Sequence, residues 1–171
     1  MNSPLKLSGA IEAETASRYF FYVAIFNVLI AAGATTPILL PQLGLPLVLQ
    51  IWPGTWMLIA YFSFLIAGVA GVFVWSAMYY MLPRLFGRMS VSRPLSLIHL
   101  ILFEVGVVGS TGLMGLFPGY TGGTLMHNGF GQFIVTRIIE WTVIPIGIFI
   151  GIAIIATLTG IANVILNLTS P

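Results

Sequence analysis

The stretch that decides the fold is GTWMLIAYFSFLIAGVAGVFVWSAMYYMLPRLFGR, residues 54–88. Between Trp56 and Leu82 it contains no charged side chain, and it is longer than the roughly 20 residues that an α-helix needs to cross a bilayer. Arg84 and Arg88 follow the apolar run directly. The stretch therefore predicts a transmembrane helix that ends in a positively charged loop.

The rest of the chain has the same character. Of its 171 residues 58% are hydrophobic and 6% are charged, whereas soluble domains carry about 25% charged residues. Apolar segments separated by proline, glycine and arginine predict an all-α integral membrane bundle of four transmembrane helices in one domain, residues 1–171. The predicted spans are about residues 19–40, 56–82, 95–117 and 138–166.

Charge and cysteine content exclude several classes of function. The net charge of +2 is small and dispersed, which argues against nucleic acid as a partner. No cysteine is present, so disulfides and thiolate metal sites are excluded. The arginines of the second loop (Arg84, Arg88, Arg93) lie on the same side of a four-helix protein as Lys6 and Arg18, and the positive-inside rule then places both termini in the cytoplasm.

Residues 54–88 resemble the tenth transmembrane helix of haem–copper oxidase subunit I and the loop after it. In that family the helix reads roughly D-T-x-x-V-V-A-H-F-H, and its end reads Y-Y-W-F-P-K-x-x-G-R. The residues that match in register and without a gap are Thr55, Ala60, Phe62, Gly68, Tyr79, Tyr80, Pro83, Gly87 and Arg88.

A weaker resemblance continues beyond this stretch. Leu95, His99 and Gly106 match a family pattern L-x-x-x-H-F and the glycine that follows it. The first and fourth spans match on position and hydropathy alone, so the chain as a whole resembles the C-terminal helices of subunit I, about helices nine to twelve. In the family, helices ten and eleven also join on the cytoplasmic side, in agreement with the arginines.

The departures from the family concern its cofactors. Tyr61 and Ser63 stand where the family has the two histidines that hold its haem irons, and this kind of haem ligation needs imidazoles. Residues 117–129, FPGYTGGTLMHNG, contain no arginine where the family has the pair that holds haem propionates. The copper ligands belong to helices six and seven, which this sequence does not include. We expect no catalytic, cofactor-binding or metal-binding residue in this chain, and haem and copper in partner subunits.

Glu104 is a carboxyl group near the middle of the third span. Ionisable groups inside a membrane are costly and often mark function, which suggests a proton relay or a partner for a basic group on another subunit. The structural alternative is a protonated glutamic acid bonded to a neighbouring helix. We favour the structural alternative. The two histidines, His99 and His127, are expected at opposite ends of the membrane, so they share no site and act as hydrogen-bonding groups.

Small residues follow two of the spans. Such residues let transmembrane helices approach closely, either within this chain or at a contact with another subunit, and both interpretations stay open. The glycines are Gly106, Gly109, Gly112 and Gly115 in the third span, and Gly147 and Gly151 in the fourth.

The leading hypothesis is a non-catalytic accessory subunit of a respiratory haem–copper terminal oxidase, whose partners are the lipid bilayer and other membrane subunits, subunit I above all. The chain would sit in the cytoplasmic membrane of a prokaryotic cell. One alternative is a piece of a split oxidase subunit I or a small b-type cytochrome. Another is a membrane subunit of an unrelated transport complex.

Overall fold

The computed structural model describes residues 4–40, 45–49, 52–86 and 91–169. Within these ranges the chain forms four long helices and no strand, so the predicted all-α bundle of four membrane-spanning helices is confirmed. Gly87 and Arg88, which belong to the oxidase-like stretch, lie outside the described residues.

The first two long helices form a hairpin. The first is α1 (Pro4–Leu39), and a short helix, α2 (Leu45–Val48), lies in the connection after it. The second is continuous from residue 56 to residue 86 but changes its winding on the way. Its parts are α3 (Trp56–Ser63), the π-helix η1 (Phe64–Gly71) and α4 (Val72–Phe86).

The last two long helices form a second hairpin of similar design. The third long helix consists of α5 (Arg93–Met114), the π-helix η2 (Gly115–Gly122) and α6 (Gly123–His127). The fourth consists of α7 (Gln132–Ile139), the 3-10 turn η3 (Glu140–Thr142) and α8 (Val143–Thr169).

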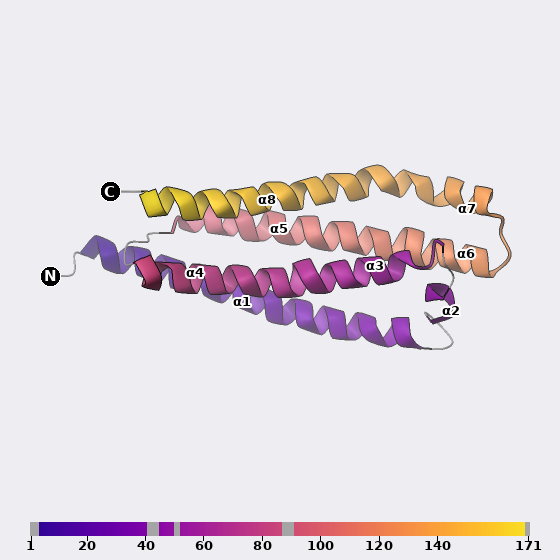
Figure 1. Cartoon of the computed structure of the whole chain (residues 1–171), viewed down its shortest axis with the longest axis horizontal. Coiled ribbons are helices and arrows are strands. Elements are labelled where there is room, and N and C mark those ends of the chain that lie inside the picture. The colour runs from indigo at the N-terminus through magenta and orange to yellow at the C-terminus, as the bar shows by residue number, and fades with distance from the viewer. Residues whose placement is uncertain (1–3, 41–44, 50–51, 87–90, 170–171) are drawn as a thin grey trace.

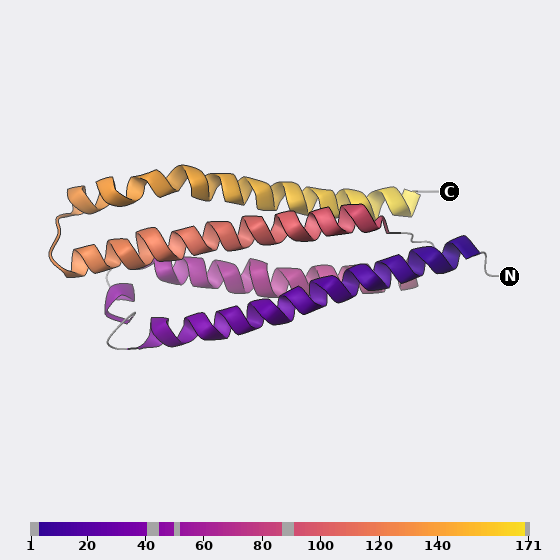
Figure 2. The ribbon, with the colours of Figure 1, turned by 180° about the vertical axis from the view of Figure 1, so that it is seen from behind.

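The four long helices run side by side along the length of the molecule, and the two chain ends lie at the same end of it (Figures 1 and 2). Within the bundle α1 packs along α4, and α5 packs along α8. The last residues of α4 and the first residues of α5 lie at the end of the molecule that carries the termini, whereas α2 and the turn between α6 and α7 lie at the opposite end (Figure 1). This arrangement agrees with the predicted four-span topology.

The predicted third span ends at about residue 117, whereas the helix continues through Pro118 to His127. The predicted fourth span starts at about residue 138, whereas the helix begins at Gln132. Proline and glycine are tolerated inside membrane helices when local changes of winding satisfy the freed backbone groups. Here the π-helix η2 contains Pro118.

The glycines after Pro118 serve close packing rather than a turn. A Cβ on Gly119 would lie 2.7 Å from the backbone nitrogen of Met57, and one on Gly122 would lie 2.6 Å from Cγ of Pro53. These contacts bring η2 against the start of α3. Gly129 is the described residue with a positive φ, 84°, and it forms the actual turn before α7.

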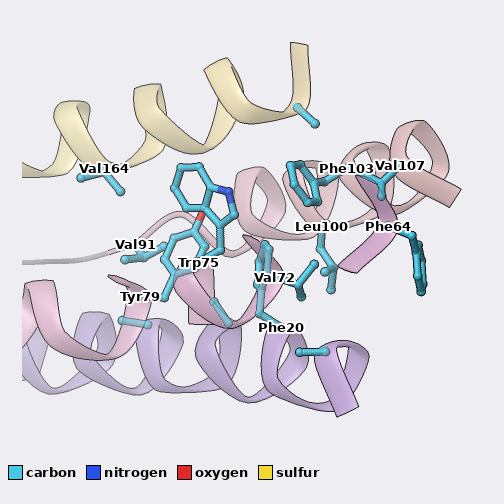
Figure 3. Close-up of a cluster of buried hydrophobic side chains, with 14 of the residues drawn as sticks. Phe20, Phe64, Val72, Trp75, Tyr79, Val91, Leu100, Phe103, Val107 and Val164 are labelled. Carbon is cyan, nitrogen blue, oxygen red and sulfur yellow. The ribbon is translucent and has the colours of Figure 1, made fainter. Parts of the chain in front are cut away.

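The core lies between the helices in the half of the bundle nearer the termini. Figure 3 shows rings from three long helices meeting there, with Phe20 from α1, Trp75 and Tyr79 from α4, and Phe103 from α5. Ser17 and Ser76 join α1 to α4, because each hydroxyl donates to the other residue's carbonyl at 2.9 Å. Aromatic packing and paired hydroxyls together hold the first hairpin closed.

The topology predicts a labelling pattern. Cysteine introduced at Ser92 and at Asn128 should react with a membrane-impermeant maleimide from opposite sides, because these residues lie at opposite ends of the third long helix. The chain contains no cysteine of its own, so wild-type protein is an unlabelled control. Labelling of both variants from the same side would contradict the four-span arrangement.

Candidate functional site

Tyr61 and Ser63 lie on α3, in the half of the bundle away from the termini. The Tyr61 hydroxyl is 2.6 Å from Oγ1 of Thr35 on α1. Because Thr35 donates its own proton to the carbonyl of Ala31 at 2.8 Å, Tyr61 is the donor in this pair. The Tyr61 phenol therefore forms part of the contact between α1 and α3. Ser63 is half-buried, two residues further along α3.

Glu104 is bonded to another helix of this chain. Nδ2 of Asn27, on α1, lies 3.0 Å and 3.2 Å from the two carboxyl oxygens of Glu104 on α5. The same nitrogen donates to the carbonyl oxygen of Gly68, in η1, at 2.7 Å. The side chain of Asn27 is 1% exposed. One buried amide thus joins three of the four long helices near the middle of their lengths.

This arrangement is the one that the structural interpretation of Glu104 calls for, namely a bond to a neighbouring helix. An unpaired amide or carboxyl group in an apolar environment is costly, and each of these groups has a partner within the chain. The structure describes no basic side chain bonded to Glu104. Its interpretation as a proton relay remains a prediction.

His99 forms a second polar centre, nearer the termini. Its side chain is fully buried, and its Nδ1 lies 3.0 Å from the hydroxyl of Tyr79 on α4. Trp75 lies perpendicular to its ring at a centroid distance of 4.3 Å, and Phe20 lies at 5.0 Å. Gly160 of α8 lies so close that any Cβ there would overlap the His99 ring. His99 therefore packs against all three of the other long helices.

Among the side chains that the structure describes, Nε2 of His99 is the buried polar atom without a hydrogen-bond partner. Close by, the side-chain oxygen of Asn163 on α8 accepts the backbone N–H of Ser92 at 3.2 Å, and its amide nitrogen donates to Oγ of Ser96 at 3.0 Å. Asn163 thereby ties α8 to the start of α5. The hydrogen bond expected of His99 is the one that its Nδ1 makes with the hydroxyl of Tyr79.

The structure does not bring the two histidines together. His127 is exposed at the end of α6, about 42 Å from His99 at the helical rise of 1.5 Å per residue. No group of three His, Cys, Asp or Glu side chains gathers anywhere in the described part of the chain. Arg137 and Glu140, three residues apart on the fourth long helix, form an exposed ion pair of 3.2 Å.

The glycines of the two small-residue tracks divide into two groups. The first group packs within the chain. A Cβ on Gly106 would lie 2.5 Å from the backbone nitrogen of Ala153, one on Gly109 would overlap the ring of Phe149, and one on Gly115 would lie 3.3 Å from Cβ of Ala60. The second group has nothing within 4 Å of the Cβ position. Its members are Gly112, Gly147 and Gly151.

Gly112 opens into a pocket of about 470 Å³ between α1, α3 and the α5–η2 helix. We call it the α1–α5 pocket and define it by Ile30, Ala34, Tyr61, Val108, Gly112 and Leu116. Its walls are almost entirely apolar. Its lining includes Tyr61, one of the two residues that stand where the resembled family has haem-ligand histidines.

Comparison of the chain with known protein families, with curated proteins and with solved structures finds no match.

Sequence reasoning overlooked Asn27, Tyr79 and Asn163 as partners in these polar centres. The two asparagines carried a usable signal, because a strongly polar residue inside an apolar span is expected to bond across helices. Which helix each would reach depends on how the helices pack, and spacing along the chain does not contain that information.

The Asn27 centre predicts different effects for two substitutions. Asn27→Leu leaves the Gly68 carbonyl and the Glu104 carboxyl without their donor, and we expect it to lower the free energy of unfolding by about 1–2 kcal/mol. Glu104→Gln keeps an oxygen that accepts from Asn27, and we expect a change within about 0.5 kcal/mol. Unfolding in mixed micelles measures both. A loss for Glu104→Gln as large as that for Asn27→Leu would show that the carboxyl group does more than accept this bond.

Proposed function

We propose that the chain is a non-catalytic accessory or structural membrane subunit of a respiratory haem–copper terminal oxidase complex or supercomplex. It would lie in the cytoplasmic membrane of a prokaryotic cell with both termini inside. The observation that carries the proposal is a division among the residues that resemble subunit I. Gly68, Tyr79, His99 and Gly106, which match the family, make contacts between helices, whereas the two ligand positions have other residues.

Three of the matching residues illustrate the first half of this division. Gly68 offers the carbonyl that Asn27 binds, Tyr79 bonds to His99, and Gly106 allows Ala153 of α8 to approach. The first contact connects η1 to α1, the second connects α4 to α5, and the third connects α5 to α8. A chain that keeps these residues keeps the means of assembling four such helices.

The second half concerns the positions where haem would be bound. Tyr61 uses its hydroxyl proton on Thr35, and Ser63 offers no imidazole. We therefore propose that this chain binds no haem or copper, and that both belong to partner subunits. Its contribution to the oxidoreductase complex would be support rather than chemistry.

The partner would contact α8. This helix is the least covered of the four, since 11% of the most apolar stretch of residues 132–166 is buried, against 28% in residues 93–127. Gly147 and Gly151 form a small-residue pair on it with open space at both Cβ positions. Small residues of this spacing let a second transmembrane helix approach closely. We propose that this second helix belongs to subunit I of the oxidase.

A membrane subunit of an unrelated transport complex is the second candidate. It is favoured by the Asn27–Glu104 pair, because a carboxyl group near the middle of a span is a feature of ion and proton pathways. A split oxidase subunit I or a small b-type cytochrome would need haem ligands that these positions do not supply.

Purification from native membranes tests the proposal. We expect the affinity-tagged chain, extracted in mild detergent, to carry a haem–copper oxidase that is identified by mass spectrometry and by its haem absorption. The chain expressed alone should show no haem absorption, because it offers no ligand pair. Haem absorption from the chain alone would instead support a small cytochrome, and a co-purifying transporter without haem would support the second candidate.

The proposed α8 contact predicts a matched pair of variants. Gly151→Leu places a side chain where the partner helix would lie, and we expect it to reduce the amount of oxidase recovered with the chain. Gly33→Leu on α1 is the control, because its Cβ position is equally open but lies on another helix. Equal recovery with both variants would argue against α8 as the docking face. The haem absorption of the oxidase itself should be unchanged in either case.

A further inference from the structure

The α1–α5 pocket has a closed end and an open end. One turn from Ile30 and Val108, in the direction of the termini, Asn27 and Glu104 bridge α1 and α5 with hydrogen bonds of 3.0 Å and 3.2 Å. In the other direction α1 diverges from the rest of the bundle toward its C-terminal end (Figures 1 and 2). The pocket is therefore confined to one half of the membrane thickness.

Its dimensions match one leaflet. Along α1 the lining extends from Ile30 to Ile38, about 12 Å at 1.5 Å per residue. The hydrocarbon core of a bilayer is about 30 Å thick, so one leaflet contributes about 15 Å. A transmembrane helix of a partner would have to pass the Asn27–Glu104 bridge along the same surface. The hydrocarbon chain of a lipid in this leaflet, by contrast, would end before it reaches the Asn27–Glu104 bridge.

The chemistry of the walls selects an apolar occupant. The hydroxyl of Tyr61 is bonded to Thr35, and that of Thr111 donates to the carbonyl of Val107 at 2.7 Å. These two wall hydroxyls therefore require no polar ligand, and the third, that of Tyr120, lies at the open end. Apolar cavities of about 150 Å³ in proteins stay dry and take up benzene, and this pocket is about three times larger. Hydrocarbon is the occupant that such walls favour.

The open end carries a residue suited to a lipid headgroup. Tyr120 of η2 lines the pocket at the end farthest from Glu104 and is 46% exposed. Tyrosine is enriched where the hydrocarbon core meets the headgroups, because its ring is apolar and its hydroxyl is polar.

We propose that the α1–α5 pocket binds one hydrocarbon chain of a phospholipid from the leaflet opposite the termini, with the headgroup beside Tyr120. The lipid completes the wall that α1 and α5 leave open. It is held by apolar contact with Ile30, Ala34 and Val108, and Gly112 provides the space. The proposal does not depend on the identity of the complex to which the chain belongs.

Photocrosslinking tests the proposal on the full chain, purified from native membranes with whatever accompanies it and placed in nanodiscs. The probe is a phosphatidylcholine with a diazirine on its acyl chain, and mass spectrometry maps the labelled residues. We expect labelling concentrated on Ile30, Ala34 and Val108. Gly112→Leu fills the pocket and should abolish this labelling, and Gly112→Ala should reduce it. Gly33→Leu, on the same helix as the pocket wall but outside its lining, should leave it unchanged.

A thermal melt of each variant verifies that Gly112→Leu folds, as its open Cβ position leads us to expect. Labelling spread evenly over all exposed apolar residues, or unaffected by Gly112→Leu in a folded protein, would overturn the proposal. So would the loss of a co-purifying protein in Gly112→Leu, which would assign the pocket to a partner's side chain. Extraction of a quinone in place of a phospholipid from the wild-type protein would overturn it as well.

Discussion

The structure depends on one constraint, which is that a polar group surrounded by lipid has to find its partner inside the protein. The chain meets this constraint with pairs that join different helices. Asn27 bonds to a carbonyl of η1 and to the carboxyl of Glu104, Tyr79 bonds to Nδ1 of His99, and Ser17 and Ser76 bond to each other. Nε2 of His99 is the exception among the described side chains, because it is buried without such a partner. Because each pair connects separate helices, the groups that would be costly in isolation become the bonds that fix how the helices pack.

The sequence predicts the membrane helices themselves but not the side-chain pairs that join them. Long apolar runs fix the number and order of the membrane helices, because spanning needs length and hydropathy alone. The ends of the helices do not follow from hydropathy. In the sequence Pro118 suggests a helix end, yet it lies inside the π-helix η2. The glycine tracks were recognised as packing surfaces, but only the structure separates Gly109, which faces Phe149, from Gly112, which faces open space. Which helix a given residue packs against depends on how the four helices assemble.

The proposed relationship to oxidase subunit I separates residues that position a helix from residues that would hold a ligand. A helix that binds cofactors serves two purposes, because some of its residues position it and others hold the ligand. In this chain the positioning residues, such as Gly68 and Tyr79, are engaged in helix contacts, and Tyr61 takes part in a contact of its own with Thr35. The proposed role as an accessory subunit therefore requires no change in these contacts when other residues stand at the ligand positions.

The two π-helices have a geometric consequence for the faces of the long helices. A residue in an α-helix turns the chain by about 100°, so a wider turn shifts the phase between the segments before and after it. The second long helix shows the result, since α3 packs on η2 while α4 packs on α1. One continuous rod thus presents two differently oriented contact surfaces, one in each leaflet. Removing a single residue from 64–71 would restore regular winding and rotate these surfaces relative to each other, even though no contact residue had been replaced.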